Sequence, residues 1–91
     1  MGTVRPVRPS TLLGRLLNGV VTNVDFADAG RLLEALGFEK VRVTGSHHIY
    51  AHPGIQEQIN LQNHRGQAKP YQLRQLAALV RRYNLRIEEP K

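Results

Sequence analysis

The sequence predicts an α+β fold in which two helices cover one face of a three-stranded antiparallel sheet. Two segments, residues 26–36 and 70–83, place apolar side chains at the 3.6-residue period of a helix. Between them, residues 40–62 contain short segments in which apolar and polar residues alternate, as they do in strands. With 91 residues the chain is long enough for one small domain, so we expect these elements to share one core.

The N-terminal residues predict a short extra helix. Residues 1–9 contain prolines and arginines without apolar periodicity, and we expect them to be disordered. Residues 10–17 place leucines at helical spacing, with Ser10 as the expected N-cap and Asn18-Gly19 as the end. Such a short helix is unstable alone, so it is expected to dock on the chain or on a partner. Residues 1–24 are therefore interpreted as an extension and residues 25–87 as the main domain.

The second helix has sequence signals at both ends. Asp25 is the expected N-cap, and Asp28 is the expected partner in a shortened capping box. Gly37 stands where a left-handed residue ends a helix, and Phe38 can fold back on the last turn. The predicted apolar side consists of Phe26, Ala29, Leu32, Leu33 and Leu36.

Strands are predicted over residues 40–44, 47–52 and 57–62, with a tight turn at Gly45-Ser46. We expect Val41 and Val43 to face the helices, and His47 to lie at the inner edge of the second strand. The outer face of that strand then holds His48, Tyr50 and His52.

The last helix is predicted to begin at Pro70, because proline fits the first helical position. Residues 63–69, which precede it, are interpreted as a basic loop that contains a glycine. Asn84 is expected to end the helix. Its apolar side is predicted at Leu73, Leu76, Ala77, Val80 and Tyr83.

The charge of the chain is positive and unevenly distributed. There are 13 Lys+Arg against 7 Asp+Glu, a formal net charge of +6. Residues 58–87 contain basic residues and no acidic ones, a distribution that attracts polyanions such as nucleic acids. A cationic surface without a nucleic-acid role is the other interpretation. The chain has no cysteine, which excludes disulfides and thiolate metal sites. It also lacks an apolar stretch of ~18 residues, and we expect a cytoplasmic protein without a membrane role.

The histidines do not predict a metal site. Residues 43–54 contain most of them, but neighbouring strand residues such as His47 and His48 point to opposite faces. His48 and His52 share a face at about 13 Å from each other, too far apart for two Zn–N bonds. We therefore expect no metal and no other cofactor.

A histidine in this segment can nevertheless act on RNA. Imidazole exchanges protons near neutral pH, and RNA contains its own nucleophile, the 2′-OH. His47 follows a Gly-Ser turn, where the backbone can approach a phosphate closely and Ser46 can hydrogen-bond to it. No carboxylate partner is evident in the sequence. The residues alone therefore leave open that His47 and His48 are ordinary strand histidines.

A family resemblance rests on three segments, LLEALGFEKVRVTGSHHIYAHPG, INLQ and GQAKPYQLRQL. Together they resemble the HicA family of toxin ribonucleases from bacterial toxin–antitoxin systems, over about residues 25–85. The resemblance implies an α-β-β-β-α fold like that of double-stranded-RNA-binding domains. It also implies cleavage of mRNA without metal, and a HicB-type antitoxin that covers the active face. The family's catalytic histidine falls on His47, with His48 as a lesser candidate.

The sequence hypothesis is thus a toxin endoribonuclease that acts on single-stranded or messenger RNA. His47 serves as base toward the 2′-OH or as acid toward the leaving 5′ oxygen. A non-catalytic RNA-binding module of the same fold is the main alternative, and a protein-interaction domain that meets an acidic partner is the third. The expected RNA-binding residues are Arg42, Ser46, His48, Tyr50, Lys69 and Arg74.

Overall fold

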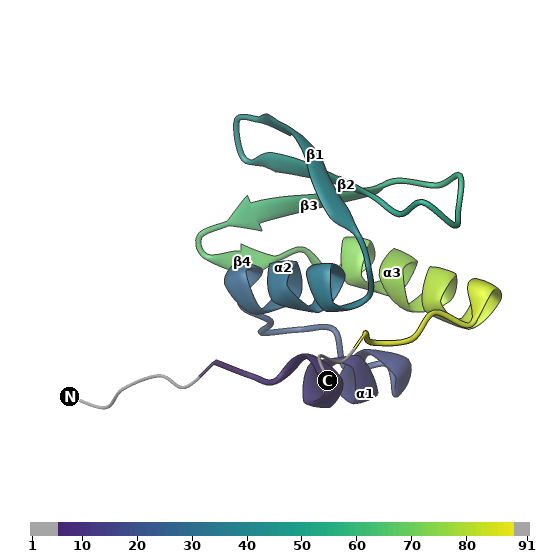
Figure 1. Ribbon diagram of the computed structural model, residues 1–91. Coiled ribbons are helices and arrows are strands. Elements are labelled where there is room, and N and C mark those ends of the chain that lie inside the picture. The colour runs from purple at the N-terminus through teal and green to yellow at the C-terminus, as the bar shows by residue number, and fades with distance from the viewer. Residues whose placement is uncertain (1–5, 89–91) are drawn as a thin grey trace.

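The computed structural model describes residues 6–88 and arranges them in three layers (Figure 1). The elements are α1 (Pro9–Leu17), α2 (Phe26–Ala35), β1 (Glu39–Thr44), β2 (His47–Ala51), β3 (Ile59–His64), β4 (Gln67–Ala68) and α3 (Pro70–Tyr83). The strands form one antiparallel sheet in the order β1-β2-β3-β4. One face of the sheet, here called the helix side, lies against α2 and α3, and α1 lies beyond those helices. The opposite face is called the open side. The predicted α+β fold is confirmed, with a short fourth strand added.

Helix α1 packs into the core of the chain itself. It begins at Pro9, with Arg8 as the extended residue before it, so the prediction of Ser10 as N-cap is wrong. Proline favours this start because its φ is already helical. Leu12 and Leu16 are buried, and α1 contacts both α2 and α3. Disorder was predicted for residues 1–9, of which positions 1–5 lie outside the described residues.

The first turn of α2 is capped by backbone from another part of the chain. Asp25 is the N-cap residue, but its side chain makes no capping hydrogen bond. The N–H of Phe26 instead donates to the carbonyl of Gly66 at 2.8 Å. Asp28, the predicted capping-box partner, pairs with Arg31. The start of α2 therefore depends on the turn between β3 and β4.

The C-terminal end of α2 has the predicted geometry. Gly37 adopts a φ of 97°, which an L side chain rarely adopts. The N–H of Phe38 donates to the carbonyl of Leu33 at 2.9 Å, as in a Schellman motif. Phe38 is buried in the core. The chain is thus turned back from α2 into β1.

The register of β1 and β2 separates the two adjacent histidines, but it reverses the faces predicted for β2. Val43 pairs with His48, and Lys40 pairs with Tyr50. Tyr50 is only 3% exposed and belongs to the core, so it lies on the helix side. His48 lies on that side too, and His47 lies on the open side. The assignment of His48 and Tyr50 to the outer face is therefore wrong.

Val43 lies on the helix side, as predicted, because it pairs with His48. Two features of β1 explain why its valines were nevertheless a poor guide to the buried face of β2. β1 is an edge strand, and Val41 and Val43 remain 52% and 53% exposed. A β-bulge around Val41 also shifts the register. The large buried side chain on the helix side is Tyr50 of β2 instead. Its hydroxyl oxygen lies 3.1 Å from the point that a Cβ atom on Gly30 would occupy, so the two residues are closely packed. A large aromatic at the centre of the sheet is buried in preference to valines at its edge.

The strands β3 and β4 form a hairpin where the sequence predicted a loop. β3 runs on to His64, beyond the predicted end at residue 62, and residues 67–68 pair with it. Arg65 and Gly66 form the turn with φ values of 54° and 85°. Positive φ at both residues is the pattern of a type I′ turn. Arginine rarely adopts this conformation, so only the glycine pointed to a turn in the sequence.

Helix α3 begins at Pro70 and ends before Asn84, as predicted. Asn84 adopts a left-handed conformation with φ 52° and ψ 47°. The N–H of Leu85 donates a hydrogen bond to the carbonyl of Val80 at 3.0 Å. Neither α3 nor any other described helix is long and apolar enough to cross a membrane.

One polar side chain of α3 is fully buried. The Oε1 atom of Gln72 accepts a hydrogen bond from the backbone N–H of Gln62 at 2.7 Å. Gln62 lies in β3, directly opposite His47. Because β4 pairs only with Asn63 and His64, it leaves Gln62 without a strand partner on that side. The amide of Gln72 supplies the missing acceptor.

Candidate active site

His47 is the first residue of β2 and follows the turn that joins β1 to β2. Gly45 in that turn has a φ of 58°, and Ser46 beside it is exposed. Antiparallel pairing places Thr44 of β1 and Gln62 of β3 opposite His47. The ring is half-buried on the open side, where α2 and α3 do not cover the sheet. A large ligand can therefore reach it.

The ring of His47 is held from the neighbouring strand by Asn60. The Nδ1 atom of His47 lies 3.0 Å from Nδ2 and 3.2 Å from Oδ1 of the Asn60 amide. Nδ1 is thus occupied by a hydrogen bond in either orientation of the amide. The ring nitrogen that remains for a substrate is Nε2.

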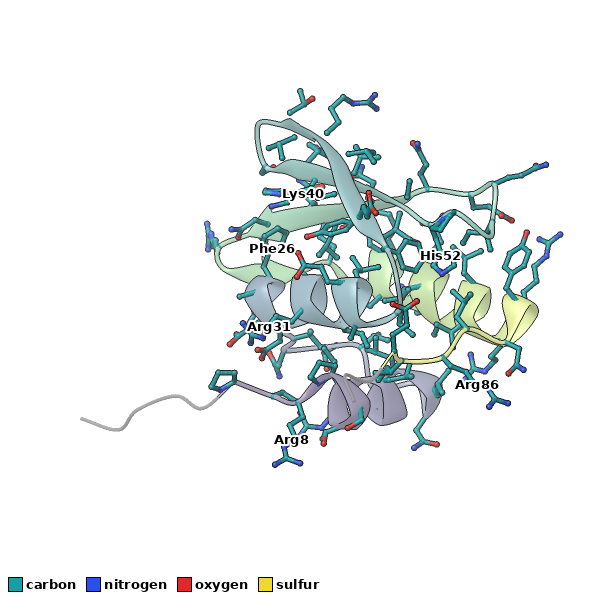
Figure 2. The ribbon with its side chains drawn as sticks, viewed as in Figure 1. Arg8, Phe26, Arg31, Lys40, His52 and Arg86 are labelled. Atoms are coloured by element: carbon teal, nitrogen blue, oxygen red, sulfur yellow. The ribbon has the colours of Figure 1, made fainter. Side chains whose placement is uncertain are left out.

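His48 has a different environment on the helix side. Its ring contacts the edge of Phe26 at a centroid distance of 4.7 Å, and Phe26 points from the start of α2 toward the sheet (Figure 2). Its Nδ1 atom is buried and has no hydrogen-bond partner within residues 6–88. Burial, and secondarily the charge of Lys40, lower the pKa of His48 below its ordinary value. The neutral ring is therefore favoured.

Tyr50 cannot stack on a base, because it lies inside the protein. Burial raises the pKa of its hydroxyl, and the carboxylate of Glu34 adds to that rise. The predicted stacking role of Tyr50 is therefore wrong. An exposed aromatic does exist on α3, where Tyr71 is 56% exposed between Lys69 and Arg74.

The predicted phosphate-binding residues fall into two groups. Arg42 pairs with Ile49 and so lies on the open side with His47, and Ser46 is in the adjacent turn. Lys69 and Arg74 belong to the start of α3, in the layer below the sheet. The structure therefore brings only Arg42 and Ser46 to the surface around His47.

No arrangement for metal binding occurs within residues 6–88, where no three His, Cys, Asp or Glu side chains are grouped to hold an ion. His52 directly follows the last residue of β2, at the opposite end of the strand from His47, and is labelled in Figure 2. Its Nδ1 atom accepts the N–H of Gly54 at 2.9 Å, and its ring contacts Phe38 at 5.1 Å between centroids. His52 therefore packs against Phe38 and a loop, and its predicted place on the outer face is wrong.

Comparison with protein families gives a match to the HicA toxin of bacterial toxin–antitoxin systems, over residues 26–81. The match spans more than half of the chain. The chain belongs to the HicA toxin family. As a HicA toxin it is one half of a toxin–antitoxin pair, so its partner is an antitoxin. Comparison with curated proteins found no match, and comparison with solved structures found none either.

The HicA match runs from the start of α2 almost to the end of α3. It therefore includes His47, Asn60 and every strand of the sheet. Helix α1 lies outside the matched residues, although it packs into the same core. The family core and the physical core of this HicA toxin are thus not the same set of residues.

Sequence reasoning missed three residues of this HicA toxin that the structure makes prominent. Asn60 and Gln72 were hidden because a polar letter in a strand or helix does not show its hydrogen-bond partner. Tyr71 was overlooked in favour of Tyr50, since composition does not distinguish a buried tyrosine from an exposed one. A weak signal existed only for Asn60, which alternates with the apolar Ile59 and Leu61 and so had to lie opposite to the core.

Proposed function

We propose that this HicA toxin is an endoribonuclease that cleaves mRNA without a metal ion and is neutralised by a HicB-type antitoxin. The observation that supports it most is the placement of His47. Its Nδ1 atom is engaged by Asn60, while Nε2 is left for substrate on the open side of the sheet. A non-catalytic RNA-binding module would not need a histidine ring that is held at Nδ1 with Nε2 directed to the open side.

In the proposed reaction, Nε2 of His47 removes the proton from a ribose 2′-OH. The 2′ oxygen then attacks the adjacent phosphorus, and the bond from phosphorus to the 5′ oxygen breaks. The leaving 5′ oxygen takes a proton from water at this open surface, and the hydroxide that remains takes the proton from Nε2, which restores the neutral ring of His47. The products are a 2′,3′-cyclic phosphate and a 5′-hydroxyl. No metal or redox partner is needed to balance these steps.

The charges around His47 support binding of the RNA backbone. Arg42 lies on the same side of the sheet and can stabilise the charge that builds up on the phosphate. Ser46, in the exposed turn, is a hydrogen-bond donor to the same group. We assign Lys69 and Arg74 to flanking phosphates. Tyr71, exposed between them, replaces Tyr50 as the residue on which a base stacks.

A HicB-type antitoxin would neutralise this toxin most directly by covering the open side around His47. An acidic surface on the antitoxin would complement the net charge of +6. The proposal places the reaction in the cytoplasm, where mRNA is available.

The test compares wild type with His47→Gln on single-stranded RNA, with and without EDTA, and identifies the product ends. We expect His47→Gln to lower the cleavage rate by about 10²–10⁴-fold, the usual contribution of acid–base catalysis. EDTA should have no effect, and the 3′ products should end in cyclic phosphate. His52→Gln, which lies beyond the opposite end of β2 from His47, is the matched control and should cleave like wild type.

Each arm can contradict the proposal in its own way. Cleavage that persists in His47→Gln would remove His47 from the mechanism, and loss of cleavage with EDTA would restore a metal. Tight RNA binding by wild type without any cleavage would favour the non-catalytic RNA-binding module.

A further inference from the structure

Asn60 is the side-chain hydrogen-bond partner of His47 in the described chain. It pairs with Ile49 in the register of β2 and β3, so it is the diagonal neighbour of His47 on the open side. Both polar atoms of its amide lie close to Nδ1 of the ring, Nδ2 at 3.0 Å and Oδ1 at 3.2 Å. Both side chains are half-buried, so water is partly kept from the contact.

The orientation of this amide determines which ring nitrogen holds the proton. When Oδ1 faces the ring, Nδ1–H donates to it and Nε2 keeps the lone pair that a general base needs. When Nδ2 faces the ring, it donates to Nδ1, and the proton lies on Nε2. After Nε2 has accepted a proton from RNA, Nδ1–H still donates to Oδ1. The first orientation therefore suits His47 before and after proton transfer.

We infer that Asn60 is a positioning residue whose Oδ1 holds Nδ1–H of His47 and directs Nε2 toward the RNA. This inference rests on the proposed function, because it assigns a task within that reaction. It also explains how the imidazole works without a carboxylate partner. Asn60 is neutral, so it fixes the tautomer without adding a charge that would favour the protonated ring.

The charged and titratable side chains around His47 do not hold its ring, which is instead held by Asn60. On the open side they are Glu39 and Arg42 of β1 and His64 of β3. The helices α2 and α3 lie on the other side of the sheet. Among residues 6–88, no charged side chain hydrogen-bonds or ion-pairs with His47.

The kinetic experiment measures RNA cleavage across pH by wild type, Asn60→Ala, Asn60→Asp and Gln58→Ala. Asn60→Ala should lower kcat about 10- to 100-fold with KM nearly unchanged, because the ring loses its orientation. Asn60→Asp should recover much of kcat. The acidic limb of the pH–rate profile of Asn60→Asp should move to higher pH, since a carboxylate stabilises the protonated ring. Gln58→Ala, an exposed amide just before β3, should match wild type.

A second measurement does not depend on activity. Imidazole ¹⁵N NMR of the full-length protein without RNA should show the neutral His47 proton on Nδ1 in wild type and in Asn60→Asp. In Asn60→Ala that preference should weaken. A wild-type proton on Nε2 would overturn the inference, and this spectrum remains decisive even where Asn60→Ala folds poorly.

The outcomes separate this inference from the proposed function. If wild type does not cleave RNA, the proposed function fails, while the spectrum still tests the contact. If wild type cleaves and Asn60→Ala keeps its kcat and pH profile, the positioning role fails and the proposed function stands.

Discussion

At the scale of single residues, His47 and His48 are neighbours in the chain with the sheet between their side chains. His47 lies on the open side with the Asn60 amide at its Nδ1, and nothing among residues 6–88 hydrogen-bonds to its Nε2. His48 packs on Phe26, and its buried Nδ1 has no hydrogen-bond partner among residues 6–88. The first arrangement suits proton transfer. The second favours an uncharged ring that fills space, so we interpret His48 as a packing residue.

The environment of His48 predicts a pH dependence of stability. Its pKa in the folded protein lies below the ordinary value of 6.5, because of burial and then of Lys40. Between that lowered pKa and 6.5, the unfolded chain binds more protons than the folded one. The contribution of His48 to stability is therefore complete above 6.5 and is lost as pH falls toward the folded pKa. His48→Phe should reduce the loss of stability between about pH 7 and pH 5.

Urea unfolding at the two pH values measures this effect. Phenylalanine can keep the contact with Phe26 while removing the titration and the unbonded nitrogen. His64→Gln, at an exposed histidine, is the control. An unchanged pH dependence in His48→Phe would show that the ring does not resist protonation.

At the scale of elements, the C-terminal end of α2 and both ends of α3 were predicted well, and the starts of α1 and α2 and the edges of the sheet poorly. Gly37, Pro70 and Asn84 act through local backbone geometry, so the sequence alone was enough to place them. Strand β4 and the start of α2 depend on residues far apart in the chain. The carbonyl of Gly66 that receives the N–H of Phe26 has no signature in either segment.

The contact between α3 and β3 leads to a second prediction. Gln72→Leu fills a similar volume but leaves the N–H of Gln62 buried without an acceptor. The expected loss is about 1–3 kcal/mol of unfolding free energy, measured by urea denaturation. Gln75→Leu, on the exposed side of the same helix, should be nearly neutral. Equal effects of the two substitutions would mean that the bond to Gln62 adds nothing.

At the scale of the whole molecule, α1 completes a core that the strands, α2 and α3 leave uncovered. The sheet lies on one side of α2 and α3, and α1 lies on the other (Figure 1). Leu12 and Leu16 join the same cluster as Leu32 and Leu76. The N-terminal helix is therefore structural in this chain, although the HicA match begins only at residue 26.

This arrangement predicts that α1 contributes to global stability. Leu16→Ala should lower the unfolding free energy by about 2–5 kcal/mol, the usual cost of a buried leucine cavity. Thr11→Ala, on the exposed side of α1, should cost little. Thermal unfolding followed by circular dichroism should show one cooperative transition at a lower Tm. A separate early transition in Leu16→Ala would instead show that α1 folds apart from the rest.

The sequence by itself determined the α+β class, the order of the main elements, the C-terminal end of α2, both ends of α3, and the separation of His47 from His48. These follow from periodicity and from the conformational limits of glycine, proline and asparagine, which act over a few residues. The tertiary structure decided which side of the sheet is buried, and therefore that His47 faces outward and Tyr50 inward. Alternation along a strand defines two faces but does not say which one is inside. That choice depends on the bulge in β1 and on the packing of Tyr50 against Gly30, which are contacts between elements.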